Sequence, residues 1–401
     1  MTSVALESGS VKGQAARTVV VLLGPSLGAL TSLALVPAMP AIAAHFGTAG
    51  SGEMFAKMMT ATPALTCLLG APAVGWAAEQ FGERRCLLLS YLIFTLAGMA
   101  GLIISDPTIL MVSRGVLGLG SAGIMTLSSA MIAEYYAGNM RERLYGFSSS
   151  LAAVTSILLM VVGGRLVDWA GWRAPFGFYL AGLAMFAIAW PATKASQTAG
   201  IKGRPNIHTQ GSAGALWGLW PLYLLLVIFA IGMFMPLIQG PFLLGSVGVK
   251  RAALVGEFIA VSIIASIPAS ASFGFLSRAL GERNILVLVA AFLGGGAVIL
   301  ALSTDNVSLA VGFAVSGLGA GLLVPALTAM ILSRAPAAVR GPAAGFIFTA
   351  IFLGQFVTPL VSHPLELGFG LKDAFIVIGI GIGLAGLAGY APSVTRRSAS
   401  G

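Results

Sequence analysis

Long apolar stretches separated by short polar turns run along nearly the whole chain of 401 residues. The apolar residues form continuous runs rather than alternating with polar ones, and this pattern predicts helices. A run of about 20 apolar residues is long enough for a helix to cross the hydrocarbon core of a bilayer. Twelve such stretches are expected, at about 18–46, 54–78, 86–105, 108–136, 143–169, 173–193, 217–245, 252–279, 285–303, 307–334, 341–362 and 371–391.

The second half of this pattern repeats the first at a fixed distance of 199 residues. The turn that starts at Gly75 and contains Gly82-Glu83-Arg84 returns at Gly274 and Gly281-Glu282-Arg283. The same spacing relates further landmarks: Pro37 with Pro236, Gly118-Leu119-Gly120 with Gly317-Leu318-Gly319, Ala130-Met131-Ile132 with Ala329-Met330-Ile331, Arg141 with Arg340, and Gly146-Phe147 with Gly345-Phe346. One offset shared by charged turns and glycine runs indicates a duplicated half, which is typical of transporters that bind their substrate between the two halves.

A polar segment at residues 194–216 separates the two repeats. It is the one long polar connection in the chain, and we expect it to be a cytoplasmic linker. It would join an N-terminal six-helix bundle (18–193) to a C-terminal six-helix bundle (217–391), with cytoplasmic tails at 1–17 and 392–401. The predicted fold class is an all-α integral membrane protein with twelve transmembrane helices in two pseudo-twofold-related bundles.

Composition and charge agree with a membrane protein. The chain is 57% hydrophobic and 9% charged, with a mean hydropathy of +0.96, whereas soluble domains contain about 25% charged residues. If the N-terminus is inside, 15 of the 22 Lys and Arg residues lie in loops on that side and six lie in loops on the other. The positive-inside rule therefore predicts that both termini are cytoplasmic. The expected location of the chain is the cell inner membrane. The net charge of +9 then reflects topology rather than nucleic-acid binding.

The first apolar stretch has two interpretations. Ala41-Ile42-Ala43 is similar to a signal-peptidase site, so a cleaved secretory signal is one of them. Pro37 has a counterpart in the second repeat at Pro236, which favours a permanent helix. The pairs Pro37 with Pro40 and Pro236 with Pro241 are expected to bend the outer ends of the two equivalent helices.

Two motifs resemble the major facilitator superfamily of transporters. The turn at residues 75–85 is similar to that family's signature between helices 2 and 3, where Gly82 and Arg84 match and Glu79 takes the place of an Asp. The stretch Arg114–Gly120 is similar to the family's helix 4 motif. The resemblance covers nearly the whole chain. It implies a secondary active transporter that moves a small organic solute by alternating access, with protons as the coupling ion.

The end of the fifth stretch and the start of the sixth resemble the drug:proton antiporter branch of the family. Gly163-Gly164 followed by Gly171-Trp172-Arg173-Ala174-Pro175-Phe176 carries this resemblance. Leu159 and Met160 replace the Gly-Pro pair that the branch usually has, so the motif is degenerate. The resemblance implies proton-coupled efflux of hydrophobic compounds. Import of an organic anion is the alternative, and a non-transporting membrane receptor is a remote one.

Three charged residues are candidates for proton coupling or for opposing a substrate charge. Arg114 lies in an apolar stretch, where burying its guanidinium costs at least about 2.5 kcal/mol. Its alternative role is to snorkel or to pair with a helix end. Glu53 and Glu257 lie near the starts of two predicted helices and are either proton carriers or rim charges. Glu53 precedes Lys57 by four residues, which favours an ion pair.

A conformational latch is expected at the cytoplasmic end of the first repeat. Charged residues of the signature turn would form ion pairs with an acid at the end of the fourth predicted helix. These ion pairs would break when the two bundles move relative to each other. The alternative is that the loop charges are simply solvated. The latch candidates are Gly75, Glu79, Gly82, Arg84 and Glu134.

The substrate cavity is expected to be lined by uncharged polar residues. The candidates are Gln239, Gln355, Thr31 and Thr126; the hydroxyl groups alternatively join helices. His45, His208 and His363 lie far apart in the sequence, and no phosphate loop or nucleophile with a base is found. The sequence therefore predicts no enzyme, no metal and no cofactor, and a monomer whose partners are a small-molecule substrate, protons and the lipid bilayer.

Overall fold

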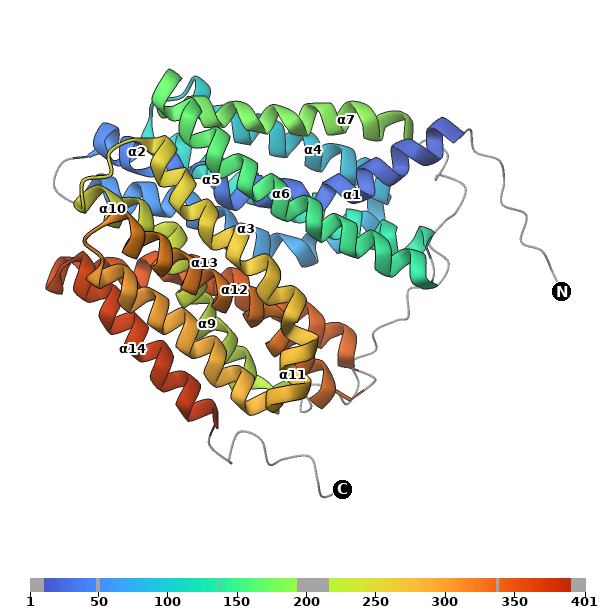
Figure 1. Cartoon of the computed structure of the whole chain (residues 1–401). Coiled ribbons are helices and arrows are strands. Elements are labelled where there is room, and N and C mark those ends of the chain that lie inside the picture. Colours follow the sequence, from blue (N-terminus) through green and yellow to red (C-terminus); the bar gives the residue numbers. More distant parts are fainter. Residues whose placement is uncertain (1–10, 48–50, 137, 193–215, 337–338, 391–401) are drawn as a thin grey trace.

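The computed structural model describes residues 11–47, 51–136, 138–192, 216–336 and 339–390. Within these ranges two helical bundles lie side by side (Figure 1). The first contains α1 (Val11–Leu33), η1 (Val36–Ala38), α2 (Met39–Phe46), α3 (Ser51–Phe81), α4 (Glu83–Met99), η2 (Ala100–Leu102), α5 (Pro107–Tyr135), α6 (Gly138–Ala170), η3 (Ala174–Tyr179) and α7 (Leu180–Ala192). The second contains α9 (Trp220–Ile238), α10 (Gly240–Ser246), α11 (Ala252–Leu302), α12 (Asn306–Arg334), α13 (Arg340–Phe369) and α14 (Leu371–Tyr390). The expected C-terminal tail, nearly all of the linker and the first ten residues of the N-terminal tail lie outside the described residues.

The described part of the chain contains eleven helical segments that are long and apolar enough to cross a membrane. One of them, α11, has 51 residues and would be about 77 Å long if straight, which is more than twice the about 30 Å of a bilayer core. Its backbone is non-helical at Gly281, with φ 78° and ψ 164°. The segment is therefore two spans joined by a tight turn, and the twelve predicted spans in two bundles are confirmed.

The 199-residue repeat is visible in the backbone as well as in the sequence. Helices α5 and α12 begin and end at equivalent positions of the two halves. The signature turns have the same unusual conformation, with φ 88° at Gly82 and φ 78° at Gly281. A second glycine pair that the sequence comparison missed, Gly171 and Gly370, has φ 79° and 95°. Glycine tolerates these values because it has no Cβ, so the repeat preserves the residues that its turns require.

The ends of equivalent helices are also stabilised in equivalent ways. The carboxylates of Asp106 and Asp305, 199 residues apart, accept hydrogen bonds from the first backbone amides of α5 and α12. At the exposed Asp305, the hydrogen bonds from Ser308 and then from Val307 hold the pKa of the carboxyl below its usual value. Arg141 donates from Nε to the carbonyl of Tyr136 at 2.9 Å, and Arg340 repeats this bond to the carbonyl of Ala335 at 3.3 Å.

The predicted proline bends are confirmed. Helix α1 ends at Leu33, and Pro37 and Pro40 lie at the starts of η1 and α2. Helix α9 ends two residues after Pro236, and α10 starts with Pro241 in its first turn. Proline lacks an amide hydrogen and clashes with the preceding turn, so each of these long spans changes direction near one end.

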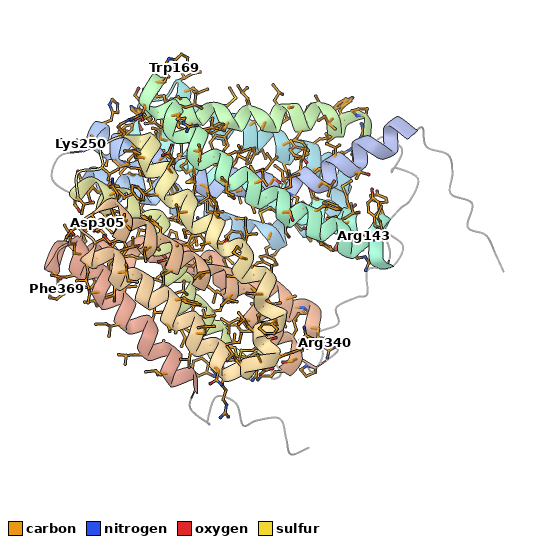
Figure 2. The ribbon with its side chains drawn as sticks, in the orientation of Figure 1. Arg143, Trp169, Lys250, Asp305, Arg340 and Phe369 are labelled. Carbon is orange, nitrogen blue, oxygen red and sulfur yellow. The ribbon has the colours of Figure 1, made fainter. Side chains whose placement is uncertain are left out.

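The two bundles meet at one end of the molecule and diverge toward the other (Figure 1). We call the end with α2 and α10 the α2 end, and the end where α1 begins the termini end. Figure 2 marks the α2 end with Trp169 and Lys250 and the termini end with Arg143 and Arg340. Helix α3 packs against α13 across the bundle interface, and α6 packs against α11. We call these contacts the α3–α13 seam and the α6–α11 seam.

Candidate functional site between the two bundles

Lys57 lies in the α3–α13 seam with a side chain that is 0% exposed. A buried ammonium is costly unless charged partners surround it. Its Nζ atom lies 2.5 Å from Oε2 of Glu366, 3.4 Å from Oε2 of Glu53 and 3.5 Å from Nδ1 of His363. The ammonium also lies 4.7 Å from the centre of the Phe242 ring, within cation–π range. Residues of both bundles therefore share one positive charge, and the expected ion pair of Glu53 with Lys57 is confirmed.

Further polar contacts surround Glu366 in the second bundle. Its Oε2 atom lies 3.1 Å from Nδ1 of His363 and accepts a hydrogen bond from Nε2 of Gln239 at 3.3 Å. The same Gln239 amide donates to Oγ of Ser362 at 2.7 Å, while its Oε1 atom is buried and has no hydrogen-bond partner among the described residues. We call the following residues the seam cluster: Glu53, Lys57, Gln239, Ser362, His363 and Glu366.

A cavity of about 570 Å³ lies beside the seam cluster at the α2 end. We call it the vestibule, and its lining residues are Pro40, Ala43, Ala44, Gly47, Gly52, Glu53, Pro241, Phe242, Gly245, Ser246, Glu366 and Leu371. Glu53 and Glu366 are the ionisable members of this lining, with side chains that are 39% and 13% exposed. The vestibule therefore gives both carboxylates access to solvent, whereas Lys57 is sealed beneath them.

A second polar bridge between the bundles lies deeper in the interface. Nε2 of Gln355 on α13 donates to the carbonyl of Thr60 on α3 at 3.3 Å, and its Oε1 lies 3.5 Å from Oγ of Ser32 on α1. The other expected cavity residues lie elsewhere. Thr31 joins α1 to α5 by donating to Oγ of Ser121 at 2.9 Å, and Thr126 is half-buried on α5. Substrate contact by Gln239, Gln355 and the two threonines stays a prediction.

The α6–α11 seam is packed by glycine. A Cβ atom on Gly164 would lie 2.3 Å from the carbonyl oxygen of Ala252, and one on Gly256 would lie 2.0 Å from the carbonyl oxygen of Met160. Both distances are far below van der Waals contact, so no side chain larger than hydrogen fits at either position. The absence of a Cβ atom lets the backbones of α6 and α11 come into direct contact. This seam holds its helices together by direct backbone contact.

Asp168 adds a charged hydrogen bond across the α6–α11 seam. Its two carboxylate oxygens accept from the backbone amides of Ala252 at 2.9 Å and Ala253 at 3.1 Å. These amides belong to the first turn of α11, which has no partner for them within the helix. A carboxylate of one bundle therefore caps a helix of the other, and it lies 3.8 Å from Nε of Arg251 as well.

Glu257, a candidate proton carrier, lies at the surface of the same seam. It pairs with Arg165 at 3.3 Å, and the two side chains are 44% and 65% exposed. Exposed pairs of this kind contribute little to stability, about 0–1 kcal/mol. The structure therefore places this carboxylate in water rather than in a buried pocket, and a proton-carrier role stays a prediction.

Arg114 is buried within the first bundle rather than between the bundles. It donates to the carbonyls of Ala97 and Gly98, both at 2.9 Å, and to the hydroxyl of Tyr179 at 3.2 Å. Its guanidinium also lies 5.0 Å from the centre of the Phe176 ring. These contacts satisfy carbonyls at the end of α4, which is the helix-end alternative for this residue. A coupling role for Arg114 stays a prediction.

The latch candidates lie at the termini end. Gly75 is inside α3, and Gly82 forms the turn to α4. Arg84 donates to the carbonyl of Trp190 at 3.3 Å and stacks on the ring of that residue, a contact within the first bundle. Glu79 is exposed, and the side chain of Glu134 lies outside the described part of the structure. A latch between the bundles at this end therefore stays a prediction.

His363 and Glu366 are the site residues that sequence reasoning missed. The eleventh stretch is predicted to end at about residue 362, but α13 continues to Phe369. The predicted boundary is wrong because hydropathy treats a histidine and a glutamate as the polar end of a span. A signal was present, since residues three apart on a helix lie on one face, and Glu53 and Lys57 lie on another helix with similar spacing.

An apolar cavity of about 540 Å³ lies between α9 and α13 toward the termini end and is open to the outside, since Trp217, Trp220 and Phe346 in its lining are 73%, 55% and 47% exposed. Its lining residues are Leu216, Trp217, Trp220, Tyr223, Leu224, Val227, Phe346, Thr349, Ala350 and Leu353. We call it the aromatic cavity, because four of these ten residues are aromatic. Its lining contains no carboxylate, ammonium, guanidinium or imidazole group.

Comparison with known proteins supports a transporter. The chain matches the family model of the Major Facilitator Superfamily over residues 21–359. It is 25% identical over 366 residues to "Multidrug resistance protein 2" of Bacillus subtilis (strain 168), which covers 87% of this chain and 89% of that protein. It is 27% identical over 194 residues to "Chloramphenicol resistance protein" of Pseudomonas aeruginosa, which covers 46% and 45% of the two chains.

Solved structures share the fold at low sequence identity. A bacterial homolog of the human lysosomal transporter Spinster, in an inward-facing and unoccupied conformation, has a TM-score of 0.79 at 15% identity and covers 95% of this chain and 97% of its own. A D-xylose-proton symporter has a TM-score of 0.72 at 17% identity and covers 95% and 99%. The family match over most of the chain and the two six-span bundles lead to one conclusion. The chain belongs to the Major Facilitator Superfamily and is a multi-pass membrane transporter rather than an enzyme.

Proposed function

We propose that this transporter exports small hydrophobic organic compounds in exchange for protons. The single observation that carries the proposal is the aromatic cavity. Its volume of about 540 Å³ is in the usual range of small-molecule sites, about 300–1,000 Å³. A lining without ionisable acids or bases favours an apolar solute with aromatic rings over a charged one. The names of the relatives, multidrug and chloramphenicol resistance proteins, agree with this solute class.

The direction of transport is inferred from the arrangement of the bundles. The seam cluster and the contacts of Asp168 join the bundles at the α2 end, and the bundles diverge toward the termini end (Figure 1). The excess of basic residues on the side of the termini favours a cytoplasmic location for that end. Solute would then enter from the cytoplasm or the inner leaflet of a bacterial inner membrane, which is the first step of export.

Import of an organic anion has weaker support. Arg114, together with the replacement of the Gly-Pro pair by Leu159 and Met160, favours that alternative in the sequence, and an importer of this kind needs a cationic side chain that is free to oppose the anion. The described hydrogen bonds of Arg114 go to two backbone carbonyls and a tyrosine hydroxyl of its own bundle. The other buried cation, Lys57, is paired with two carboxylates. Lys57 is therefore paired with acids of the protein. Arg114 has hydrogen bonds from its two terminal nitrogens within the first bundle, and its Nε is buried without a hydrogen-bond partner among the described residues.

The proposal is tested with purified protein in lipid vesicles. Efflux of chloramphenicol and of a hydrophobic fluorescent dye is measured with and without an imposed proton gradient, and uptake of labelled benzoate is measured in parallel. We expect the gradient to accelerate efflux of at least one apolar compound and a protonophore to abolish that effect. Gradient-driven benzoate uptake without efflux of any apolar compound would instead support the importer.

A pair of tryptophan variants tests the aromatic cavity itself. Trp220→Ala removes one ring from the lining, and we expect about three- to tenfold slower efflux, since an aromatic contact contributes about 0.5–1.5 kcal/mol. Trp169→Ala is the matched control, because this exposed residue lies at the α2 end, away from the cavity (Figure 2). Equal efflux by the two variants would show that the aromatic cavity does not bind the exported compound.

A further inference from the structure

The charges of the seam cluster do not balance. Helix α3 contributes the Glu53 carboxylate and the Lys57 ammonium, and α13 contributes the Glu366 carboxylate and the His363 imidazole. With a neutral imidazole, two negative charges face one positive charge. The other elements around the vestibule, α2, α10 and the first residue of α14, contribute uncharged residues to its lining. One negative charge is therefore uncompensated when the bundles close over the cluster.

Glu53 is 39% exposed and Glu366 is 13% exposed at the vestibule, so water solvates part of this charge. The remainder lies at a contact between two bundles, where an uncompensated charge is costly. A single proton on either carboxylate or on the imidazole brings the total to zero. The cluster can also accommodate a protonated carboxyl, because Oε1 of Gln239 is a buried acceptor without a partner among the described residues. A flip of this amide presents Oε1 to a hydroxyl of protonated Glu366, and the amide nitrogen already contacts that carboxylate.

We propose that the seam cluster is a proton-binding site, which holds one proton shared among Glu53, His363 and Glu366 while the α2 end is closed. Opening of the α3–α13 seam would increase the contact of both carboxylates with water, so that their excess charge is solvated further and the proton is held less tightly. Proton binding therefore favours closure of the α2 end, and proton loss favours opening. The vestibule supplies the route to the solvent on that side. The inference rests on the proton exchange proposed above and assigns it to residues other than Arg114 and Glu257.

The site is tested by a distance measurement that needs no substrate. Spin labels at Ile103→Cys and Leu302→Cys report the α2 end, because these exposed residues lie at equivalent positions of the repeat next to the ends of α4 and α11. Labels at Phe81→Cys and Leu280→Cys report the termini end in a second protein. Both use a background of Cys67→Ala and Cys86→Ser, in nanodiscs. We expect double electron–electron resonance to show a shorter distance at the α2 end as the pH falls, and the opposite change at the termini end.

Three charge variants of the seam cluster are expected to change how the α2-end distance depends on pH. Glu366→Gln and Glu53→Gln each remove one negative charge, so the α2 end should stay closed without a proton and its distance should no longer depend on pH. Lys57→Gln leaves two carboxylates facing each other. Closure then needs two protons, and its midpoint should move to lower pH by about one unit or more. Asp373→Asn, at an exposed acid of α14 that does not line the vestibule, should keep the wild-type midpoint.

The outcomes that overturn the proposal differ from those that overturn export. A wild-type α2-end distance that is independent of pH would remove the seam cluster as a proton site. A wild-type titration that persists unchanged in both Glu366→Gln and Glu53→Gln, or a Lys57→Gln midpoint that stays or rises, would do the same. A wild-type protein that titrates as expected but exports no apolar compound in vesicles would keep the proton site and overturn the proposed function.

Discussion

The two seams between the bundles are equivalent by the repeat and different in chemistry. Counting by 199 residues, Lys57 corresponds to Gly256, and His363 corresponds to Gly164. The same offset relates Glu53 to Ala252 and Glu366 to Val167. One seam therefore has a buried ion cluster at the place where the other has glycines in backbone contact. A contact duplicated with its helices has become titratable on one side and tightly packed on the other.

The repeat preserves residues that the fold requires, and it does not preserve the buried polar residues. The turns at Gly82 and Gly281 and the caps at Asp106 and Asp305 are preserved, since the fold needs them in both halves. Buried polar groups are not preserved. Arg114, for example, corresponds to Phe313, and both side chains are fully buried. Both bundles therefore need a large buried side chain at this position to fill the same space. Only the first bundle uses the position for hydrogen bonds, which Arg114 donates.

The largest decrease in stability is expected from Lys57→Met, which removes the cation of the α3–α13 seam. Glu53 and Glu366 would then lose their shared ammonium, although Glu366 keeps its contacts with His363 and Gln239; breaking a buried pair typically costs about 3–5 kcal/mol. Thermal unfolding of the purified protein should show a clear decrease in Tm, reversed in part by adding Glu366→Gln. Lys250→Met, at an exposed lysine of the α2 end, is the control. An equal Tm for the two lysine variants would contradict the buried cluster.

Gly256→Ala is expected to have the next largest effect, on the packed seam. The new methyl group would lie 2.0 Å from a backbone carbonyl of α6, and overpacking of this kind costs about 1–3 kcal/mol. The α6–α11 seam should separate, with a longer label distance at the α2 end and a lower Tm. Gly295→Ala, in the second span of α11 beyond the turn at Gly281, faces open space and should change neither quantity. If both alanine variants behave alike, the seam is not closed by backbone contact.

Asp168→Ala should have a smaller effect, confined to the same seam. Loss of a helix cap costs about 0.5–2 kcal/mol, and this cap joins two bundles. We expect a modest decrease in Tm together with a longer label distance at the α2 end. Asp106→Ala removes a cap within one bundle, so it should lower Tm without changing that distance. A distance that responds equally to both variants would show that Asp168 does not tie the bundles together.

The smallest effect is expected at the exposed pair of Arg165 and Glu257. Surface pairs contribute about 0–1 kcal/mol and are screened by salt. Glu257→Gln should therefore lower Tm slightly at low ionic strength and not at all at high ionic strength. A large decrease in Tm at high salt would mean that the α6–α11 seam, like its counterpart, depends on charge.

Much of the fold could be predicted from the sequence because hydropathy and the repeat are local signals. The spans, the signature turns and the proline bends all follow from residue types at fixed spacing. The site was harder, because hydropathy treats a charged residue as the end of a span. Glu366 lies in the last turns of α13, where Lys57 of the other bundle supplies the charge that opposes its carboxylate, and intramembrane charges are stable when paired in this way. Pairing across an interface leaves no local trace in a single sequence.

Arg114 shows the opposite error of emphasis. An arginine in an apolar stretch is a functional candidate by default, but the carbonyls of Ala97 and Gly98 accept hydrogen bonds from its Nη2 in place of an acid, while its Nε has no partner among the described residues. Which of these partners is present depends on how α4 ends beside α5. That arrangement is tertiary, and the apolar sequence around Arg114 does not contain it.

The most direct test of the account is proton movement driven by the exported compound. Vesicles containing the wild-type protein are loaded with the hydrophobic dye and diluted, and a pH-sensitive probe follows the protons. We predict that dye efflux drives protons uphill in the wild type, while Glu366→Gln lets dye flow downhill without moving protons. Uphill proton movement by Glu366→Gln with the wild-type yield would contradict the assignment of coupling to the α3–α13 seam.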